Sequence, residues 1–376
     1  MRERIRHMLR KEFIQVLRDP RMRSLLFIAP VVQLIIFGYV VTTDVRHVAT
    51  AVYDLDASVA SRDLVARFVG SGYFDVVEHV ATDARAQELL DRAEVCAVLR
   101  INQGFADDLG GGRTAQVQVI VDGTDSNTAS IVLQYGAKIA GEFSREVLVA
   151  RFSRLRGMPL VSGSVELETR AWFNENLESR VFYVPGVIAE LVMLITLLLT
   201  SMAVVREKEI GTMEQLLVTP ITPTEFILGK TIPFALISFA DVVIIILVGV
   251  LWFAVPIRGN IFLLFLATAL YLMTTVGIGL LISTVSQTQQ QAMMTTFFFA
   301  FPAILLSGFM FPIANMPTVI QWLTYLNPLR YFLVVIRGVF LKGVGLRVLW
   351  PQMAALAVVG ALTLRLATWR FRKTLA

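Results

Sequence analysis

The apolar run from Val181 to Val205 decides the fold class. It reads VFYVPGVIAELVMLITLLLTSMAVV and contains one charged residue, Glu190. As a helix rising about 1.5 Å per residue, a run of this length covers the roughly 30 Å hydrocarbon core of a bilayer. The chain then turns charged with Arg206-Glu-Lys-Glu209. The run therefore predicts a membrane-spanning helix that ends at a polar surface.

The composition and five further apolar runs extend this prediction to the whole chain. Of 376 residues, 56% are hydrophobic and 17% are charged, whereas soluble domains carry roughly 25% charged residues. A soluble protein of this size could not bury so much apolar surface, so part of it must face lipid. We predict a polytopic α-helical membrane protein with six transmembrane helices, of which the other five lie at about 22–43, 231–255, 261–284, 292–313 and 348–368.

The N-terminal run at 22–43 is too long for the core of a typical signal peptide, and no small-x-small cleavage site follows it. We interpret it as an uncleaved signal anchor that forms the first transmembrane helix. The preceding segment, 1–21, carries apolar residues at helical spacing between Ile5 and Leu17, with arginines opposite them. This pattern predicts an amphipathic interfacial helix.

Basic residues set the predicted orientation. They crowd the segment before the first span and follow the last span as Arg370, Arg372 and Lys373. The positive-inside rule places both termini and the loop at 206–230 in the cytoplasm, and the polar stretch 44–180 outside. We expect a multi-pass protein of a bacterial cytoplasmic (inner) membrane.

The segment 315–347 would be external, yet it violates that rule. It carries Arg330, Arg337, Lys342 and Arg347, it is apolar enough to enter the bilayer, and prolines and a glycine interrupt it. We predict an external re-entrant helical pair, because irregular backbone is tolerated at membrane depth where protein covers it. Its motif residues are Asn327, Pro328, Arg330 and Arg337. A seventh full span is the alternative, but it would place the basic C-terminus outside.

The polar stretch 44–180 predicts a mixed α/β extracytoplasmic domain large enough for its own core. Either it holds the external mouth in shape or it docks a periplasmic partner, and the pattern leaves both open. We expect strands at 48–53, 74–79, 95–101, 116–121 and 164–173, and helices at 58–68, 83–92 and from Asp125 or Ser126 to about Leu155.

Several kinds of site are not supported by the pattern. The single cysteine, Cys96, and three scattered histidines give no metal-ligand spacing, and the net charge of +5 comes without a nucleic-acid-binding module. The triplet Gly229-Lys230-Thr231 imitates a phosphate-binding loop, but Thr224 stands where that loop needs a glycine and no strand precedes it. We expect no catalytic, cofactor or metal site in this chain, so a partner or an ion gradient must supply the energy.

Two acids lie inside predicted spans, Glu190 in the second and Asp241 in the third. A charge within the bilayer is costly, so such residues usually face a cavity or a partner. They are candidates for binding a cation, relaying protons or pairing with an arginine. Pairing with Arg330 or Arg337 is favoured for Glu190, and the role of Asp241 stays open. The aromatic residues at 297–299 either pack against lipid or neighbouring helices, or line a path for a lipophilic substrate.

Several segments in order resemble the ABC-2 type permeases, specifically the subfamily with a large extracytoplasmic domain between the first two spans, grouped with multidrug and sodium exporters. The resemblance covers essentially the whole chain, and each segment is weak alone. The segments are Trp172-Phe-Asn-Glu175, Val184-Pro-Gly186, Arg206-Glu-Lys-Glu-Ile-Gly-Thr-Met-Glu-Gln-Leu216, Gly229-Lys230, Gln287-Thr-Gln-Gln-Gln-Ala292 and Asn327-Pro-Leu-Arg-Tyr-Phe332.

The resemblance implies that the loop at 206–230 couples this permease to a separate ABC ATPase subunit. ATP and Mg²⁺ would bind to that partner rather than to this chain. A second permease copy or a sister permease would complete the transporter in the membrane lipid, and a periplasmic adaptor is a further option. The implied coupling residues are Arg206, Glu207, Glu209, Gly211, Thr212, Glu214 and Leu216.

The leading hypothesis is therefore the permease subunit of an ABC exporter for an amphiphilic, drug-like or lipid-like substrate. An ATP-driven mechanotransmission or envelope-assembly factor would use the same loop without moving cargo. An ion-coupled secondary transporter would predict internal repeats, and we find no convincing repeat. A membrane enzyme is a further alternative, but the sequence shows no nucleophile–base pair that would support it.

Overall fold

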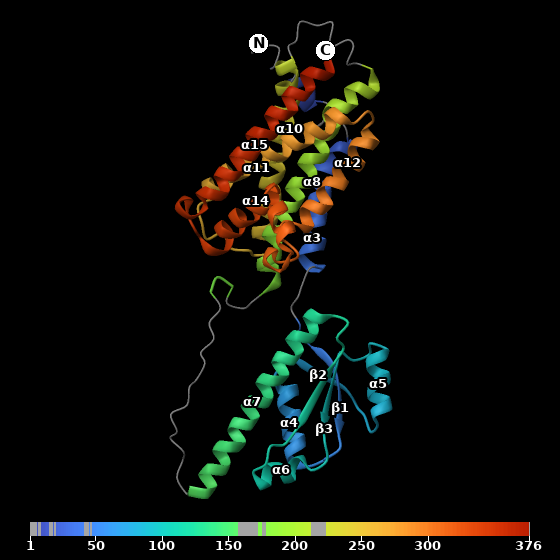
Figure 1. Ribbon diagram of the computed structural model, residues 1–376, viewed down its shortest axis with the longest axis vertical. Helices are drawn as coiled ribbons and strands as arrows, with labels where there is room; N and C mark the ends of the chain where they lie inside the picture. The colour runs from blue at the N-terminus through green and yellow to red at the C-terminus, as the bar shows by residue number, and fades with distance from the viewer. Residues whose placement is uncertain are drawn as a thin grey trace. The chain divides into compact units, whose positions relative to one another are not determined.

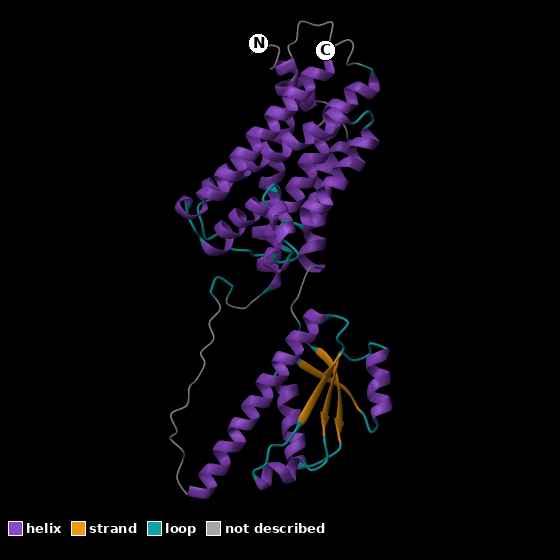
Figure 2. Ribbon diagram, viewed as in Figure 1, coloured by secondary structure: helices purple, strands orange, loops and turns teal. Residues whose placement is uncertain are grey.

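The computed structural model describes residues 6, 9–14, 18, 20–40, 45, 47–156, 172–174, 178–211 and 223–375. The chain divides into two compact units, Met1–Thr42 with Arg170–Ala376 and Thr43–Thr169. The described part of the first unit is helical, and the second combines helices with a sheet (Figure 2).

The helical unit is built around two long apolar helices, α8 (Ser179–Ile210) and α11 (Ile261–Val285), which pack against each other (Figure 1). Glycines permit this close approach, because a Cβ on Gly279 would lie 1.8 Å from the Thr200 hydroxyl oxygen. Small residues at helix contacts are typical of membrane bundles. The other elements are α2 (Pro20–Arg23), η1 (Ser24–Ile28), α3 (Ala29–Val40), α10 (Pro223–Leu251), α12 (Gln289–Leu305), η2 (Ile313–Asn315), α13 (Thr318–Thr324), α14 (Pro328–Arg337), η3 (Gly338–Lys342) and α15 (Leu346–Leu375).

Within the described residues, the structure supports a membrane-spanning bundle but does not confirm six spans. Four helices are long and apolar enough to cross a bilayer, or five if the bent pair α13–α14 counts as one span. The spans predicted at 22–43 and 292–313 are represented by shorter helices, the apolar stretch Leu26–Val40 and the 17-residue α12. Helix α12 ends at Leu305, and the turn that follows includes Gly308, whose φ of 83° is one that glycine adopts without strain.

The segment predicted to be re-entrant contains two short helices rather than one straight span. Thr318–Thr324 and Pro328–Lys342 meet at 77°. Residues 325–327 form the break, and Pro328 begins the second helix. The Asn327 side chain caps α14 by accepting a hydrogen bond from the Leu329 backbone N–H at 3.1 Å, and proline is favoured in a first helical turn. A broken span has the same geometry as a re-entrant pair, so the re-entrant topology stays a prediction.

The second unit confirms the mixed α/β prediction. Its sheet has the order β2-β1-β3-β4, with β1 parallel to β2 and β3, and β4 antiparallel to β3. The predicted strand 164–173 lies almost entirely outside the described residues. The elements are β1 (Val48–Asp54), α4 (Val59–Gly70), β2 (Phe74–His79), α5 (Asp83–Asp91), β3 (Ala97–Ile101), α6 (Phe105–Gly111), β4 (Val117–Val121) and α7 (Ser126–Arg156).

Both faces of this sheet are covered, which explains why the strands are rich in valine on either side. On β3, Leu99 packs into a core with residues of α4 and α7, whereas Val98 faces Leu89 of α5. Figure 1 shows α5 on one side of the sheet and α4 with α7 on the other. Ser58 and Thr82 begin α4 and α5 as side-chain caps, as expected for these residue types.

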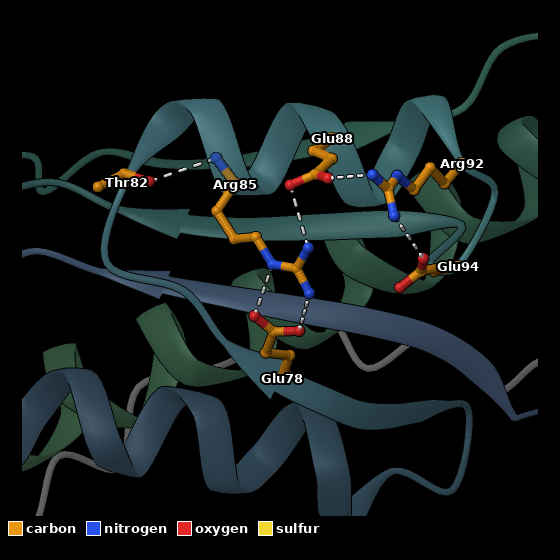
Figure 3. Close-up of polar contacts among 6 residues, drawn as sticks. All are labelled: Glu78, Thr82, Arg85, Glu88, Arg92 and Glu94. Atoms are coloured by element: carbon orange, nitrogen blue, oxygen red, sulfur yellow. Dashed lines mark hydrogen bonds and ion pairs between the residues drawn. The ribbon is translucent and has the colours of Figure 1, made fainter.

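An ion network ties α5 to the edge strand β2 (Figure 3). The Arg85 guanidinium donates to both oxygens of Glu78, at 2.9 and 2.8 Å, and to Glu88 at 3.1 Å. Arg92 contacts the same Glu88 at 2.6 Å. The hydrogen bond from Arg85 holds the pKa of Glu78 below its ordinary value of 4.5, although burial acts in the opposite direction.

This lowered pKa predicts a loss of local stability in acid. A group with a lowered folded-state pKa stabilises the fold above its unfolded pKa, and this contribution disappears as the pH falls through the folded value. We expect the attachment of β2 to α5 to be constant above about pH 5.5 and to weaken below 4.5. The measurement is hydrogen exchange of β2 amides in the full chain, corrected for intrinsic rates. Glu78→Gln should remove this pH dependence, and the control Glu94→Gln should keep it. The same dependence of exchange rate on pH in Glu78→Gln and in the unaltered chain would contradict the prediction.

Candidate functional site

At the charged end of α8, three successive side chains, Glu207, Lys208 and Glu209, contact different parts of the bundle. Successive residues on a helix point about 100° apart, so a run of charged residues faces several elements at once. Gly211 ends α8 with a left-handed backbone, φ 80°, a conformation that glycine adopts without strain. The predicted coupling residues Thr212, Glu214 and Leu216 lie outside the described residues.

Glu207 takes part in a buried ionic cluster with Glu12 and Lys230. The Lys230 Nζ lies 2.6 Å from Glu12 Oε1 and 2.6 Å from Glu207 Oε1, and the three side chains are 2%, 3% and 7% exposed. Lys11 adds a second ammonium 3.6 Å from Glu207. The two ends of the 206–230 loop are therefore joined to each other and to the N-terminal helix.

The cluster also bears on whether Lys230 belongs to a phosphate-binding loop. It lies inside α10 and is 2% exposed, so it cannot reach a nucleotide phosphate. Glu207 is buried as well, and its carboxylate accepts a hydrogen bond from Lys230 at 2.6 Å. Its contact with an ATPase stays a prediction.

Lys208 and Glu209 join the same end of α8 to α11 and α12. The Lys208 Nζ lies within hydrogen-bond distance of the carbonyls of Ser283, Thr284 and Ser286, at 3.3, 3.3 and 3.4 Å. Glu209 accepts hydrogen bonds from the backbone and side-chain nitrogens of Gln289, at 3.3 and 2.7 Å. A cation at a helix C-terminus and an anion at an N-terminus both favour the helix dipoles.

A cavity of about 180 Å³ lies beside this junction, between the N-terminal helices, α8, α10 and α12. Its polar side chains are Glu12, Gln33, Arg206, Lys230 and Gln289, and most of its remaining lining is apolar, including the aromatic ring of Phe297. One part of the wall is therefore charged and the rest suits hydrocarbon. Such a lining is complementary to an amphiphile.

The structure does not bring Glu190 to the arginines that were expected to neutralise it. Within the described residues, no ion pair joins Glu190 to Arg330 or Arg337. Glu190 instead lies near Tyr271, whose ring stacks on Phe332 at 4.2 Å and whose hydroxyl donates to the Ala189 carbonyl at 3.2 Å. The two arginines face aromatic rings, so the proposed pairing was wrong.

Asp241 is 1% exposed, and its Oδ1 has no hydrogen-bond partner among the described residues. It lies in α10 but does not line the 180 Å³ cavity, and neither does Glu190. Their assignment as functional or structural acids stays a prediction.

The Asn327–Pro328 motif fastens α14 to α12. Besides capping α14, Asn327 donates from Nδ2 to the Ala303 carbonyl at 2.6 Å. Arg330 bonds to the Thr324 hydroxyl and lies 4.0 Å from the Tyr325 ring. These contacts fix the break between the two short helices.

Sequence reasoning identified Arg206, Glu207 and Glu209 but missed Glu12, Lys208 and Lys230. The sequence did offer one signal for Lys230, because it lies at the opposite end of the 206–230 loop from the oppositely charged Glu207. Nothing in a linear pattern indicates that a glutamate in the N-terminal segment joins them.

Comparison with known proteins gives the class that this geometry indicates. The chain belongs to the ABC-2 family of transporter proteins, whose family model matches residues 20–369. It is a multi-pass membrane permease of the ABC transporter class, and this membership implies an ABC ATPase partner.

Three curated relatives cover nearly the whole chain. It is 33% identical over 373 residues to the probable multidrug ABC transporter permease YbhR of Escherichia coli K12, which covers 99% of both chains. It is 35% identical over 345 residues to the probable multidrug ABC transporter permease YbhS of the same strain, covering 90% of this chain and 89% of the relative. Identity to the E. coli inner membrane transport permease YhhJ is 31% over 369 residues, covering 97% and 96%.

Proposed function

We propose that the chain is the transmembrane subunit of an ABC exporter that moves an amphiphilic, drug-like or lipid-like substrate outward. A separate ATPase subunit, which binds ATP and Mg²⁺, contacts the loop at 206–230. The observation that carries this proposal is the junction at the end of α8, where Glu207, Lys208 and Glu209 join four elements of the bundle.

The junction offers a route for mechanical coupling. A partner that displaces the 206–230 loop displaces α8 and α10 directly, since the loop connects them. The Lys230 cluster carries the movement to the N-terminal helix, and Lys208 and Glu209 carry it to α11 and α12. Rigid-body movement of packed helices is a common switching mechanism, and here it would reshape the cavity that the same elements line.

The substrate class rests on that cavity. Its mixed lining fits a molecule with a charged and an apolar part, and two relatives are named multidrug permeases. The cavity also favours cargo transport over a purely mechanical role, which would need no such space.

The proposed topology follows the charge pattern. Both termini and the α8 junction face the cytoplasm, and the α/β unit is extracytoplasmic in a bacterial inner membrane. The transporter contains a second copy or a sister permease, and the α/β unit is where a periplasmic adaptor would bind.

Site-specific cross-linking tests the contact with the ATPase. Cys96 is replaced by serine, and Ile210, which is 62% exposed beside the junction, becomes the single cysteine. A thiol-to-amine cross-linker should join Ile210→Cys to the ATPase subunit when the two are produced together. The matched control is Val319→Cys in α13, which is 81% exposed. Cross-linking from position 319 but not from 210 would contradict the proposed coupling surface.

A further inference from the structure

Three of the four basic residues that violate the positive-inside rule line one cavity. Arg330, Arg337 and Lys342 all line a space of about 640 Å³ formed by the start of α8, the segment after α12, α14, η3 and α15. Among the described residues, its lining contains no aspartate or glutamate, and most of the other side chains are apolar, Phe182 and Leu333 among them. The volume lies within the range of small-molecule sites, roughly 300–1,000 Å³.

Arg337 carries the strongest sign of a missing ligand. Its Nε and Nη2 atoms are buried, and neither has a hydrogen-bond partner in the described part of the chain. The guanidinium lies 3.9 Å from the Phe182 ring centre and 6.0 Å from that of Phe309. Aromatic contact offsets part of the cost of burying this charge, but it leaves the N–H donors unused. A buried charged donor without an acceptor is expensive.

Two further cations, Arg330 and Lys342, line the same cavity as Arg337. Arg330 uses part of its guanidinium on the Thr324 hydroxyl and the Tyr325 ring. Lys342 is exposed at the end of η3 and forms no ion pair with a described residue. The site therefore combines the planar guanidinium of an arginine with the ammonium of Lys342. Both groups donate hydrogen bonds that suit phosphate oxygens.

The position of the cavity favours a lipid over a free ion. Phe182 and the Glu207 junction lie on the same helix, 25 residues and about 37 Å apart. That distance exceeds the roughly 30 Å hydrocarbon core of a bilayer. If the junction marks one membrane surface, the cavity lies at the other, where headgroups meet acyl chains. Its apolar walls can hold the upper part of those chains, and its three cations suit the phosphate of an anionic headgroup.

We propose that this cavity binds the phosphate group of an anionic phospholipid, with Arg337 as the main donor and Arg330 and Lys342 as supporting charges. The site lies at the opposite end of α8 from the 180 Å³ cavity. It requires neither that the lipid is exported nor that the ATPase binds as proposed above.

Native mass spectrometry of the purified full chain in detergent tests the proposal. The probes are phosphatidylglycerol, diacylglycerol with the same acyl chains, and inorganic phosphate. We expect phosphatidylglycerol to be retained at least about tenfold more strongly than diacylglycerol, consistent with charge-assisted hydrogen bonds. Inorganic phosphate should bind weakly and compete poorly. Equal retention of both lipids, or full competition by inorganic phosphate, would overturn the lipid site.

Variants assign the binding to these residues. Arg337→Gln should reduce phosphatidylglycerol retention about tenfold without lowering the melting temperature, because it removes a buried charge that lacks a partner. Lys342→Gln, at an exposed position, should give a smaller loss in a normally folded protein. Arg347→Gln is the matched control, since Arg347 is exposed and outside the lining. Unchanged retention in both Arg337→Gln and Lys342→Gln, or an equal loss in Arg347→Gln, would refute the assignment.

Discussion

Replacing Lys230 by methionine will lower the free energy of unfolding by about 3–5 kcal/mol, because removing one member of a buried ion pair leaves uncompensated charge. Here the loss is severe, since Glu12 and Glu207 both lie 2.6 Å from the Lys230 ammonium and are 3% and 7% exposed. Transport should fall with stability, because the cluster joins both ends of the coupling loop. Thermal or denaturant unfolding in detergent measures the first effect.

Two variants separate charge from packing. The triple variant Glu12→Gln, Glu207→Gln, Lys230→Met removes all three charges and should recover most of the lost stability, because a buried ion pair is often replaceable by neutral groups. Lys11→Met should cost less than about 1 kcal/mol, since Lys11 is 57% exposed and solvent screens its charge. If Lys230→Met unfolds no more readily than Lys11→Met, the cluster does not hold the junction together.

Filling the cavity beside the junction should reduce transport at least about tenfold while leaving the complex assembled. Ala203 is 6% exposed and lines the cavity, so Ala203→Phe places a ring in a space of about 180 Å³. We expect at least a tenfold reduction in substrate movement, with binding to the ATPase retained. The measurement is substrate transport by proteoliposomes, beside copurification of the two subunits.

The matched control is Ala269→Phe, because Ala269 is exposed on α11 and absent from the cavity lining. This variant should transport at the rate of the unaltered protein. Full transport by Ala203→Phe would show that the substrate takes another path.

Local features of the chain could be predicted from its sequence. The run from Val181 to Val205 does form the apolar part of α8, because length and hydrophobicity alone specify such a helix. The strands near Val48, Phe74 and Val117 were also predicted, since their composition and alternation are local signals. The limits of the span at 292–313 were wrong, because hydrophobicity continues past the turn that follows Leu305.

Long-range partners could not be predicted in the same way. Nothing in the pattern places Glu12 beside Lys230, and the pairing of Glu190 with the arginines failed because Arg337 faces Phe182 and Phe309 instead. Gly186 illustrates the difference. It was identified as part of a motif, but only the structure shows that a Cβ there would lie 2.3 Å from the Phe309 ring and 3.3 Å from Arg337 Nη2.

ATP-driven transport by the reconstituted complex tests the central claim most directly. Proteoliposomes contain this chain alone, the ATPase subunit alone, or both, and ATP hydrolysis is measured together with movement of an amphiphilic fluorescent substrate. We predict that this chain alone hydrolyses no ATP and that the substrate moves only when both subunits and ATP are present. ATP hydrolysis by this chain alone, or equal substrate movement driven by a proton or sodium gradient without the ATPase, would contradict the assignment as the permease subunit of an ABC exporter.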